Sequence, residues 1–185
     1  RFINVNHEIL FYDRVTSTMK NESQAKQHLQ AAYLEQIAAG APAAFKGNTT
    51  DFTAKYYAVF QLRTLLETHP ALIDARSIDT LRDLLNSDAY NGQHQGFFLF
   101  RETAETLASF MVHAPETALV DRSYTALKAA MTSASGNKHR AIAGAVGELP
   151  FQAVGPNVNH RRVARIPAIV WEDFLATHGF EIRGE

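Results

Sequence analysis

The segment Asn137 to Pro150, NKHRAIAGAVGELP, decides how the rest of the chain is interpreted. Its small and apolar residues predict a helix, although Gly144 and Gly147 each cost about 1 kcal/mol relative to alanine in a helix interior. We expect both glycines, with the alanines around them, to lie on the inner face of a paired helix, where a neighbouring backbone can approach closely. The segment therefore predicts a packing motif rather than a phosphate-binding loop.

The residues before this segment also carry helical patterns. Apolar side chains recur at steps of three and four, and breakers such as Gly40, His69-Pro70 and Ala114-Pro115 separate the runs. Ser77 is the predicted N-cap of the third run. No series of alternating strand residues appears in residues 20–150, so the sequence predicts an all-α fold. The predicted helices cover residues 20–39, 52–68, 78–85, 97–112, 117–134 and 137–149.

The helix pairs resemble one another in sequence. Arg101 and the small residues after it can be laid over Arg140 at an offset of about 39 residues, and Lys55 over Arg101 at an offset of about 46. Spacings near 40 with two helices per unit are typical of HEAT and armadillo arrays. HRAIAGAVGELP in particular resembles the second helix of a HEAT-like repeat, in which an arginine precedes small and apolar residues and then Gly-x-Leu. The resemblance is strongest at residues 117–150.

This resemblance implies a right-handed α-solenoid of about three antiparallel helix pairs, in which each pair packs on its neighbours. The repeat domain would cover residues 20–150, after an N-terminal arm at residues 1–19. An extended strap and a short helix near Trp171 would follow at residues 151–185 and cap the array. Because the chain begins with Arg1, we expect it to be part of a longer protein.

Composition narrows the function classes. The 185 residues have a net charge of -1, so no overall charge attracts the chain to nucleic acid or to an anionic membrane. The absence of cysteine excludes disulfides, thiolate zinc sites and a cysteine nucleophile, and it favours a cytoplasmic setting. No apolar run reaches the roughly 18 residues that a membrane span needs, so we expect no membrane partner.

Strong catalytic motifs are missing from the sequence. The eight histidines include no pair at i, i+4 spacing, and nucleophile-elbow, P-loop and dinucleotide motifs are absent, so we expect no metal, cofactor or catalytic residue. Glu102 and Glu105, one turn apart, could bind a divalent ion or divide acid and base roles. A solvated helix face paired with nearby arginines is the interpretation that we favour.

The favoured hypothesis is a non-catalytic scaffold that recognises a protein partner. The resemblance implies a concave surface lined by the second helix of each pair. The alternative is a nucleic-acid or phosphate-binding module, or a small enzyme, that uses the Glu102/Glu105 pair or the basic segment from Lys138 to Arg165. For the basic segment we favour a solvated stretch or contacts to the acidic middle of its own chain. Candidate partner-binding residues are Lys55, Arg63, Arg101, Glu105, Lys138 and Arg140, and candidate phosphate-binding residues are His160, Arg161, Arg162 and Arg165.

Overall fold

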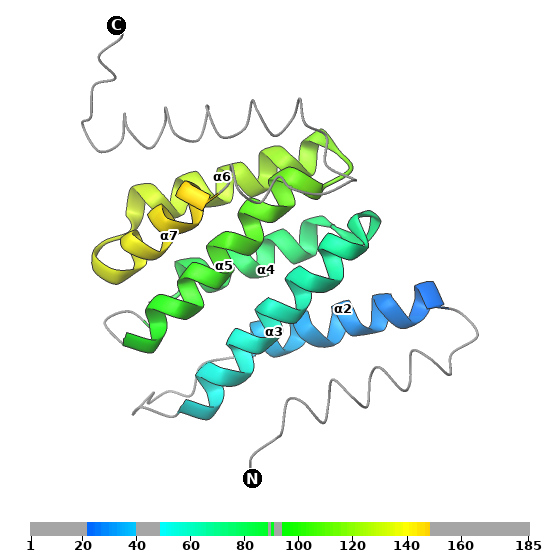
Figure 1. Cartoon of the computed structure of the whole chain (residues 1–185), viewed down its shortest axis with the longest axis horizontal. Helices are drawn as coiled ribbons and strands as arrows, with labels where there is room; N and C mark the ends of the chain where they lie inside the picture. The colour runs from blue at the N-terminus through cyan, green and yellow to red at the C-terminus, as the bar shows by residue number, and fades with distance from the viewer. Residues whose placement is uncertain (1–21, 40–48, 89, 91–93, 149–185) are drawn as a thin grey trace, which may run out of the picture.

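The computed structural model describes residues 22–39, 49–88, 90 and 94–148, and all regular structure within them is helical (Figure 1). The predicted all-α class is therefore confirmed for this part of the chain. The predicted arm at residues 1–19 and the strap and terminal helix at residues 151–185 lie outside it. The elements are α2 (Glu22–Ala38), α3 (Thr49–Thr68), the 3-10 helix η1 (Pro70–Leu72), α4 (Ala75–Asn86), α5 (His94–His113), α6 (Thr117–Ser133) and α7 (Gly136–Glu148).

Local chemistry sets the boundary between α3 and α4. Helix α3 ends before His69-Pro70, as predicted, because the residue before proline is disfavoured in the helical conformation. The prediction that Ser77 caps the next helix is wrong: the N-cap of α4 is Asp74, whose Oδ1 accepts from the Ser77 amide at 2.8 Å. An aspartate three residues upstream satisfies that free amide, so α4 begins at Ala75.

The helices form two layers, here called the front layer (α3, α5 and α7) and the back layer (α2, α4 and α6) (Figure 1). Within the front layer α5 contacts both α3 and α7, and within the back layer α4 contacts both α2 and α6. Each front helix also contacts the back helix that precedes it in sequence. Successive helices therefore alternate between the layers.

Polar contacts within a layer join residues at a nearly constant sequence separation. In the front layer this separation is 42 residues at two successive turns, so α3 and α5 run in the same direction. The back-layer separation is 43 residues. Both values lie between the offsets of about 39 and 46 obtained by aligning the sequence with itself. The contacts are Arg63 with Glu105, Ser109 with Glu67, and Arg122 with Asp79.

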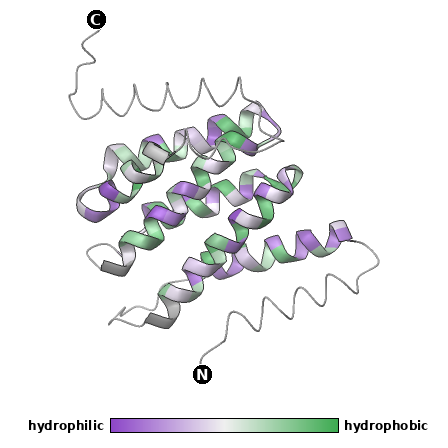
Figure 2. Ribbon diagram, in the orientation of Figure 1, coloured by the Kyte–Doolittle hydropathy of each residue, from purple (hydrophilic) through white to green (hydrophobic). Residues whose placement is uncertain are grey.

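A continuous apolar core joins the two layers, and each helix carries both hydrophobic and hydrophilic residues along its length (Figure 2). In α7 the predicted inward residues Ala141 and Ala145 are fully buried, together with Ile142. The core side chains with the largest volumes include Phe100, Phe110, Leu62, Leu66, Ile78, Leu81, Leu85, Leu99 and Leu107.

Close backbone approach occurs at a different glycine from the one predicted. A Cβ added to Gly96 would lie 2.0 Å from the carbonyl oxygen of Tyr90, so this position requires glycine. A Cβ on Gly144 would meet only the Arg101 guanidinium, at 4.0 Å, which is ordinary contact. The expected backbone approach at Gly144 is therefore wrong, because a long side chain fills the space there. The surroundings of Gly147 lie outside what the structure describes.

Candidate functional site

Four charged side chains meet between α3 and α5, and we call them the ion cluster: Arg63, Arg101, Glu102 and Glu105. Arg63 lies between the two glutamates, with Nη2 3.0 Å from Glu102 Oε1 and Nη1 3.0 Å from Glu105 Oε2. Arg101 Nε donates to the other oxygen of Glu105 at 2.7 Å. Because Glu102 and Glu105 are three residues apart on one helix, both carboxylates can reach the same arginine of α3.

The ion cluster is largely buried. The side chains of Glu102 and Glu105 are only 7% and 13% exposed, since α3 packs directly against this part of α5. The expected pairing of these glutamates with arginines is confirmed, but the expectation of a solvated helix face is wrong. Pairing also leaves the carboxylates poorly placed to bind a metal ion. Among the described residues no group of three or more histidines and acidic residues could hold one.

Burial changes the acid chemistry of Glu102. Desolvation raises its pKa to about 7, the nearby Glu105 and Glu67 carboxylates act in the same direction, and Arg63 and Arg101 oppose them. Glu102 Oε1 is close to the Arg63 guanidinium but is not aligned for a hydrogen bond. Burial, followed by the proximity of Glu102, also raises the pKa of the Tyr56 hydroxyl. The front layer therefore contains a carboxyl group that titrates near neutral pH.

Three exposed aromatic residues lie on the same two helices, and we call them the aromatic face: Tyr57, Phe60 and Phe98. Their exposed fractions are 40%, 38% and 46%. Phe60 places its ring centroid 5.8 Å from the Arg63 guanidinium carbon, so it adjoins the ion cluster. Phe98 is three residues before Arg101 on α5, a spacing that puts both side chains on one side of the helix.

Arg140 extends this surface onto α7. Its side chain is exposed, and no ion pair joins it to another residue in the described part of the chain. Gly144, one turn later on α7, faces the Arg101 guanidinium. Residues four apart share a helix face, so Arg140 lies on the side of α7 next to α5. The structure thus groups three of the predicted contact residues, Arg63, Arg101 and Glu105, and places Arg140 beside them.

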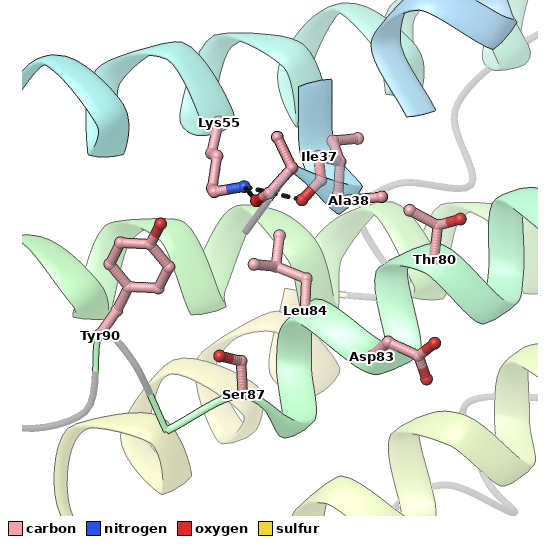
Figure 3. Close-up of a pocket in the computed structure, with 9 residues that line it drawn as sticks. Ile37, Ala38, Lys55, Thr80, Asp83, Leu84, Ser87 and Tyr90 are labelled. Atoms are coloured by element: carbon pink, nitrogen blue, oxygen red, sulfur yellow. Dashed lines mark hydrogen bonds between the residues drawn. The ribbon is translucent and has the colours of Figure 1, made fainter. Parts of the chain in front are cut away.

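Two other predicted contact residues are buried instead. Lys55 is 1% exposed, and its ammonium donates to the carbonyl oxygens of Gln36, Ile37 and Ala39 at the end of α2. Figure 3 shows the Lys55 ammonium directed at Ile37. These bonds satisfy carbonyls that a helix end leaves open. Lys55 therefore stabilises the α2 terminus rather than presenting a charge at the surface.

Lys138 has a similar role at the end of α4. It is 6% exposed and donates to the Ser87 carbonyl oxygen at 3.0 Å, with Asp88 Oδ1 at 3.4 Å. Its ammonium also lies 4.8 Å from the centroid of the Phe100 ring. The basic segment therefore begins with an internal contact. Its remaining candidates His160, Arg161, Arg162 and Arg165 lie outside the described residues.

A pocket of about 270 Å³ lies between the end of α2, α3 and the second half of α4 (Figure 3). Leu84 and Tyr90 supply apolar surface, and Asp83 and Thr80 supply polar groups. Asp83 accepts from Arg82 at 2.9 Å, and Lys55 is directed at the α2 carbonyls. The pocket therefore holds neither a lysine positioned as a nucleophile nor a cation directed at a ligand.

The aromatic face did not emerge from the sequence. Helical spacing placed Phe60 in the apolar run of its helix, and Tyr57 and Phe98 lay outside the predicted apolar positions. One signal was present: Phe97 and Phe98 are adjacent, and the side chains of adjacent helix residues point about 100° apart, so two successive aromatic rings spread over a wide arc of the helix surface.

Comparison with family models, curated proteins and solved structures finds no match to this chain. Within its described part, no helix offers a stretch sufficiently long and apolar to cross a membrane.

Proposed function

We propose that this chain is a non-catalytic protein-binding module, built as a right-handed α-solenoid of HEAT-like helix pairs, that recognises a partner through its front layer. The alternation of successive helices between two layers supports the repeat architecture. The in-layer contacts at separations of 42 and 43 residues support it further, because a stacked array places equivalent residues side by side.

The observation that carries the binding function is the aromatic face. Large apolar side chains are rarely exposed together without a reason, and aromatic residues and arginine are enriched where proteins bind each other. Here Tyr57, Phe60 and Phe98 are exposed on neighbouring helices of one layer, and arginines lie beside them. The ion cluster beneath holds α3 and α5 together, so the aromatic residues are presented on a preorganised surface.

Photo-crosslinking in an extract of the source cells tests this proposal. A photoreactive phenylalanine analogue replaces Phe60 or Phe98 in the front layer and, as the back-layer control, the half-buried Tyr124 on α6. We expect a discrete crosslinked protein from the first two positions and none from Tyr124. The crosslinked protein, once purified, should bind the chain and lose affinity by more than about tenfold when Phe60 and Phe98 are both changed to alanine.

Two results would contradict the proposal. One is crosslinking of equal strength at Tyr124, which would place any partner elsewhere on the molecule. The other is a purified partner that binds the double alanine variant as tightly as the original chain, provided that circular dichroism gives the same helix content for both.

A further inference from the structure

We infer that the front-layer surface binds an acidic peptide segment of its partner that carries apolar anchor residues. This inference rests on the proposed function and adds the chemistry of the ligand. It follows from which charged groups of the front layer face solvent and which are enclosed.

The accessible charges near the aromatic face are cationic. Arg140 is exposed and Arg101 is 35% exposed, whereas Glu102 and Glu105 turn inward to the arginines that hold them. Glu67 is exposed farther along α3, where its Oε1 accepts from Ser109 at 2.5 Å. An approaching partner therefore meets guanidinium groups next to aromatic rings. Complementary charge on a partner is carboxylate, which arginine can bind through two parallel hydrogen bonds.

The exposed aromatic residues determine which apolar side chains the ligand should carry. Tyr57 and Phe60 are three residues apart on α3, and Phe98 lies on the adjacent α5. Arg63 of α3 contacts Glu105 of α5, which is 42 residues later in the sequence. The same offset places Phe98 beside Tyr56, at the start of the α3 stretch that carries Tyr57 and Phe60. Burying such rings against apolar side chains of a partner removes a large apolar area from water. We therefore expect leucine or aromatic anchors flanked by aspartate or glutamate.

The back layer does not share this charge arrangement. Its exposed Arg122 bonds Asp79 through two nitrogens, at 2.9 and 2.6 Å, and Arg82 pairs with Asp79 and Asp83. Cations and carboxylates are thus both accessible there and neutralise each other. The front layer differs because Glu102 and Glu105 are enclosed beside partly exposed arginines, and its exposed Glu67 lies farther along α3.

Nucleic acid is the less suitable ligand for this surface. A phosphate backbone is bound by several cations in succession, and each contact releases counterions. On the front layer the glutamates neutralise two of the three arginines Arg63, Arg101 and Arg140. The exposed Glu67 of α3 lowers the net positive charge further, so the layer lacks the succession of cations that a phosphate backbone needs. A local cation beside aromatic anchors suits a short acidic peptide better.

Selection from a displayed library of random peptides tests the inference without a known partner. The full chain is immobilised, selected peptides are synthesised, and their dissociation constants are measured by fluorescence anisotropy. We expect enrichment of aspartate or glutamate together with leucine or aromatic residues. Arg140→Glu should weaken binding about fivefold, and rising salt should weaken it further. Arg76→Glu is the matched control, because Arg76 is an exposed arginine of α4 in the back layer, and it should leave the affinity unchanged.

The outcomes separate this inference from the proposed function. Selected peptides that are neutral or basic, yet are lost in the Phe60→Ala, Phe98→Ala variant, would overturn the acidic ligand and leave protein binding by the aromatic face intact. Peptides that bind the double variant unchanged, or no enrichment with a correctly folded chain, would overturn both. A fluorescent single-stranded oligonucleotide that competes with the peptides and depends on Arg140 would overturn the peptide assignment in favour of nucleic acid.

Discussion

The ion cluster of the front layer and the Asp79–Arg122 pair of the back layer both join helices of one layer, but in opposite environments. Glu102 and Glu105 are almost enclosed, whereas Asp79 is 30% and Arg122 is 46% exposed. An exposed pair is weakened by water and salt and contributes little. A buried pair contributes little net stability either, yet removing one partner leaves an uncompensated charge in the interior. Two contacts that each join neighbouring helices of one layer can therefore differ widely in how sensitive they are to mutation and to pH.

The largest expected difference in stability is between variants that lack the arginine of each contact, Arg63 in the front layer or Arg122 in the back layer. Arg63→Ala leaves Glu102 without its nearest cation, so we expect a loss of about 3 kcal/mol or more in the free energy of unfolding at pH 8. Arg122→Ala should cost less than about 1 kcal/mol because its pair is exposed. Urea denaturation of both variants measures the difference, and equal losses would show that burial does not matter here.

The pH dependence of stability is the next largest effect. Burial raises the pKa of Glu102 to about 7, above the ordinary value of 4.5, so the folded state binds the proton more tightly than the unfolded state does. Its contribution is full below pH 4.5 and is lost as pH rises through 7. Between pH 5 and 8 we expect a decrease of about 2 kcal/mol from this group.

Glu102→Gln supplies the control for that profile. The amide keeps the shape of the side chain without titrating, so the decrease between pH 5 and 8 should largely disappear and the variant should exceed the original chain in stability at pH 8. Chemical denaturation of the original chain and of the variant across this pH range measures both stability profiles. A variant whose profile still falls as steeply would assign the titration to another group.

Gly144→Ala tests how closely the helices of the front layer approach. An added methyl group meets only the Arg101 guanidinium at ordinary contact distance, and alanine favours the helix over glycine by about 1 kcal/mol. We expect a gain in melting temperature from a stabilisation of up to about 1 kcal/mol. Gly96→Ala is the opposing control, since its methyl group would overlap the Tyr90 carbonyl oxygen. A destabilised Gly144→Ala would restore the packing role predicted from sequence.

The smallest effect belongs to Asp79. Its hydrogen bond to Arg122 lowers the pKa of the carboxyl below 3.8, so its stabilisation is present above that pH and is lost as pH falls, opposite in sign to Glu102. Asp79→Asn should change the free energy of unfolding by only a few tenths of a kcal/mol at pH 7, and less in high salt. Denaturation at two salt concentrations tests this. A loss as large as that of Arg63→Ala would remove the contrast between the layers.

The helices were predictable because their signals are local. Runs of apolar residues at steps of three and four, the His69-Pro70 break and the turn residues after Ser133 lie within a few positions of the boundaries that they set. The prediction of Ser77 as the cap failed because Asp74, three residues earlier, is also a good capping residue, and only the backbone conformation distinguishes the two.

Burial of charge could not be predicted in the same way. Lys55 and Lys138 were predicted at the surface because the resemblance to HEAT-like repeats implies a contact surface on the second helix of each pair. An isolated buried ammonium is costly, but helix ends from elsewhere in the chain supply the carbonyl oxygens that compensate both lysines. Glu102 likewise depends on Arg63, 39 positions earlier in the sequence. Such partners are brought together only by the packing of helices, which helical spacing does not specify.

The position of Lys55 has a consequence for chemical labelling. An amine-reactive reagent modifies an unprotonated, accessible amine, and the Lys55 amine is enclosed while it bonds three carbonyl oxygens at the end of α2. Reagent can reach it only when the contact between Lys55 and the end of α2 opens. The rate at which Lys55 is labelled, relative to the exposed Lys128, therefore measures the frequency of that local opening rather than the accessibility of the static surface.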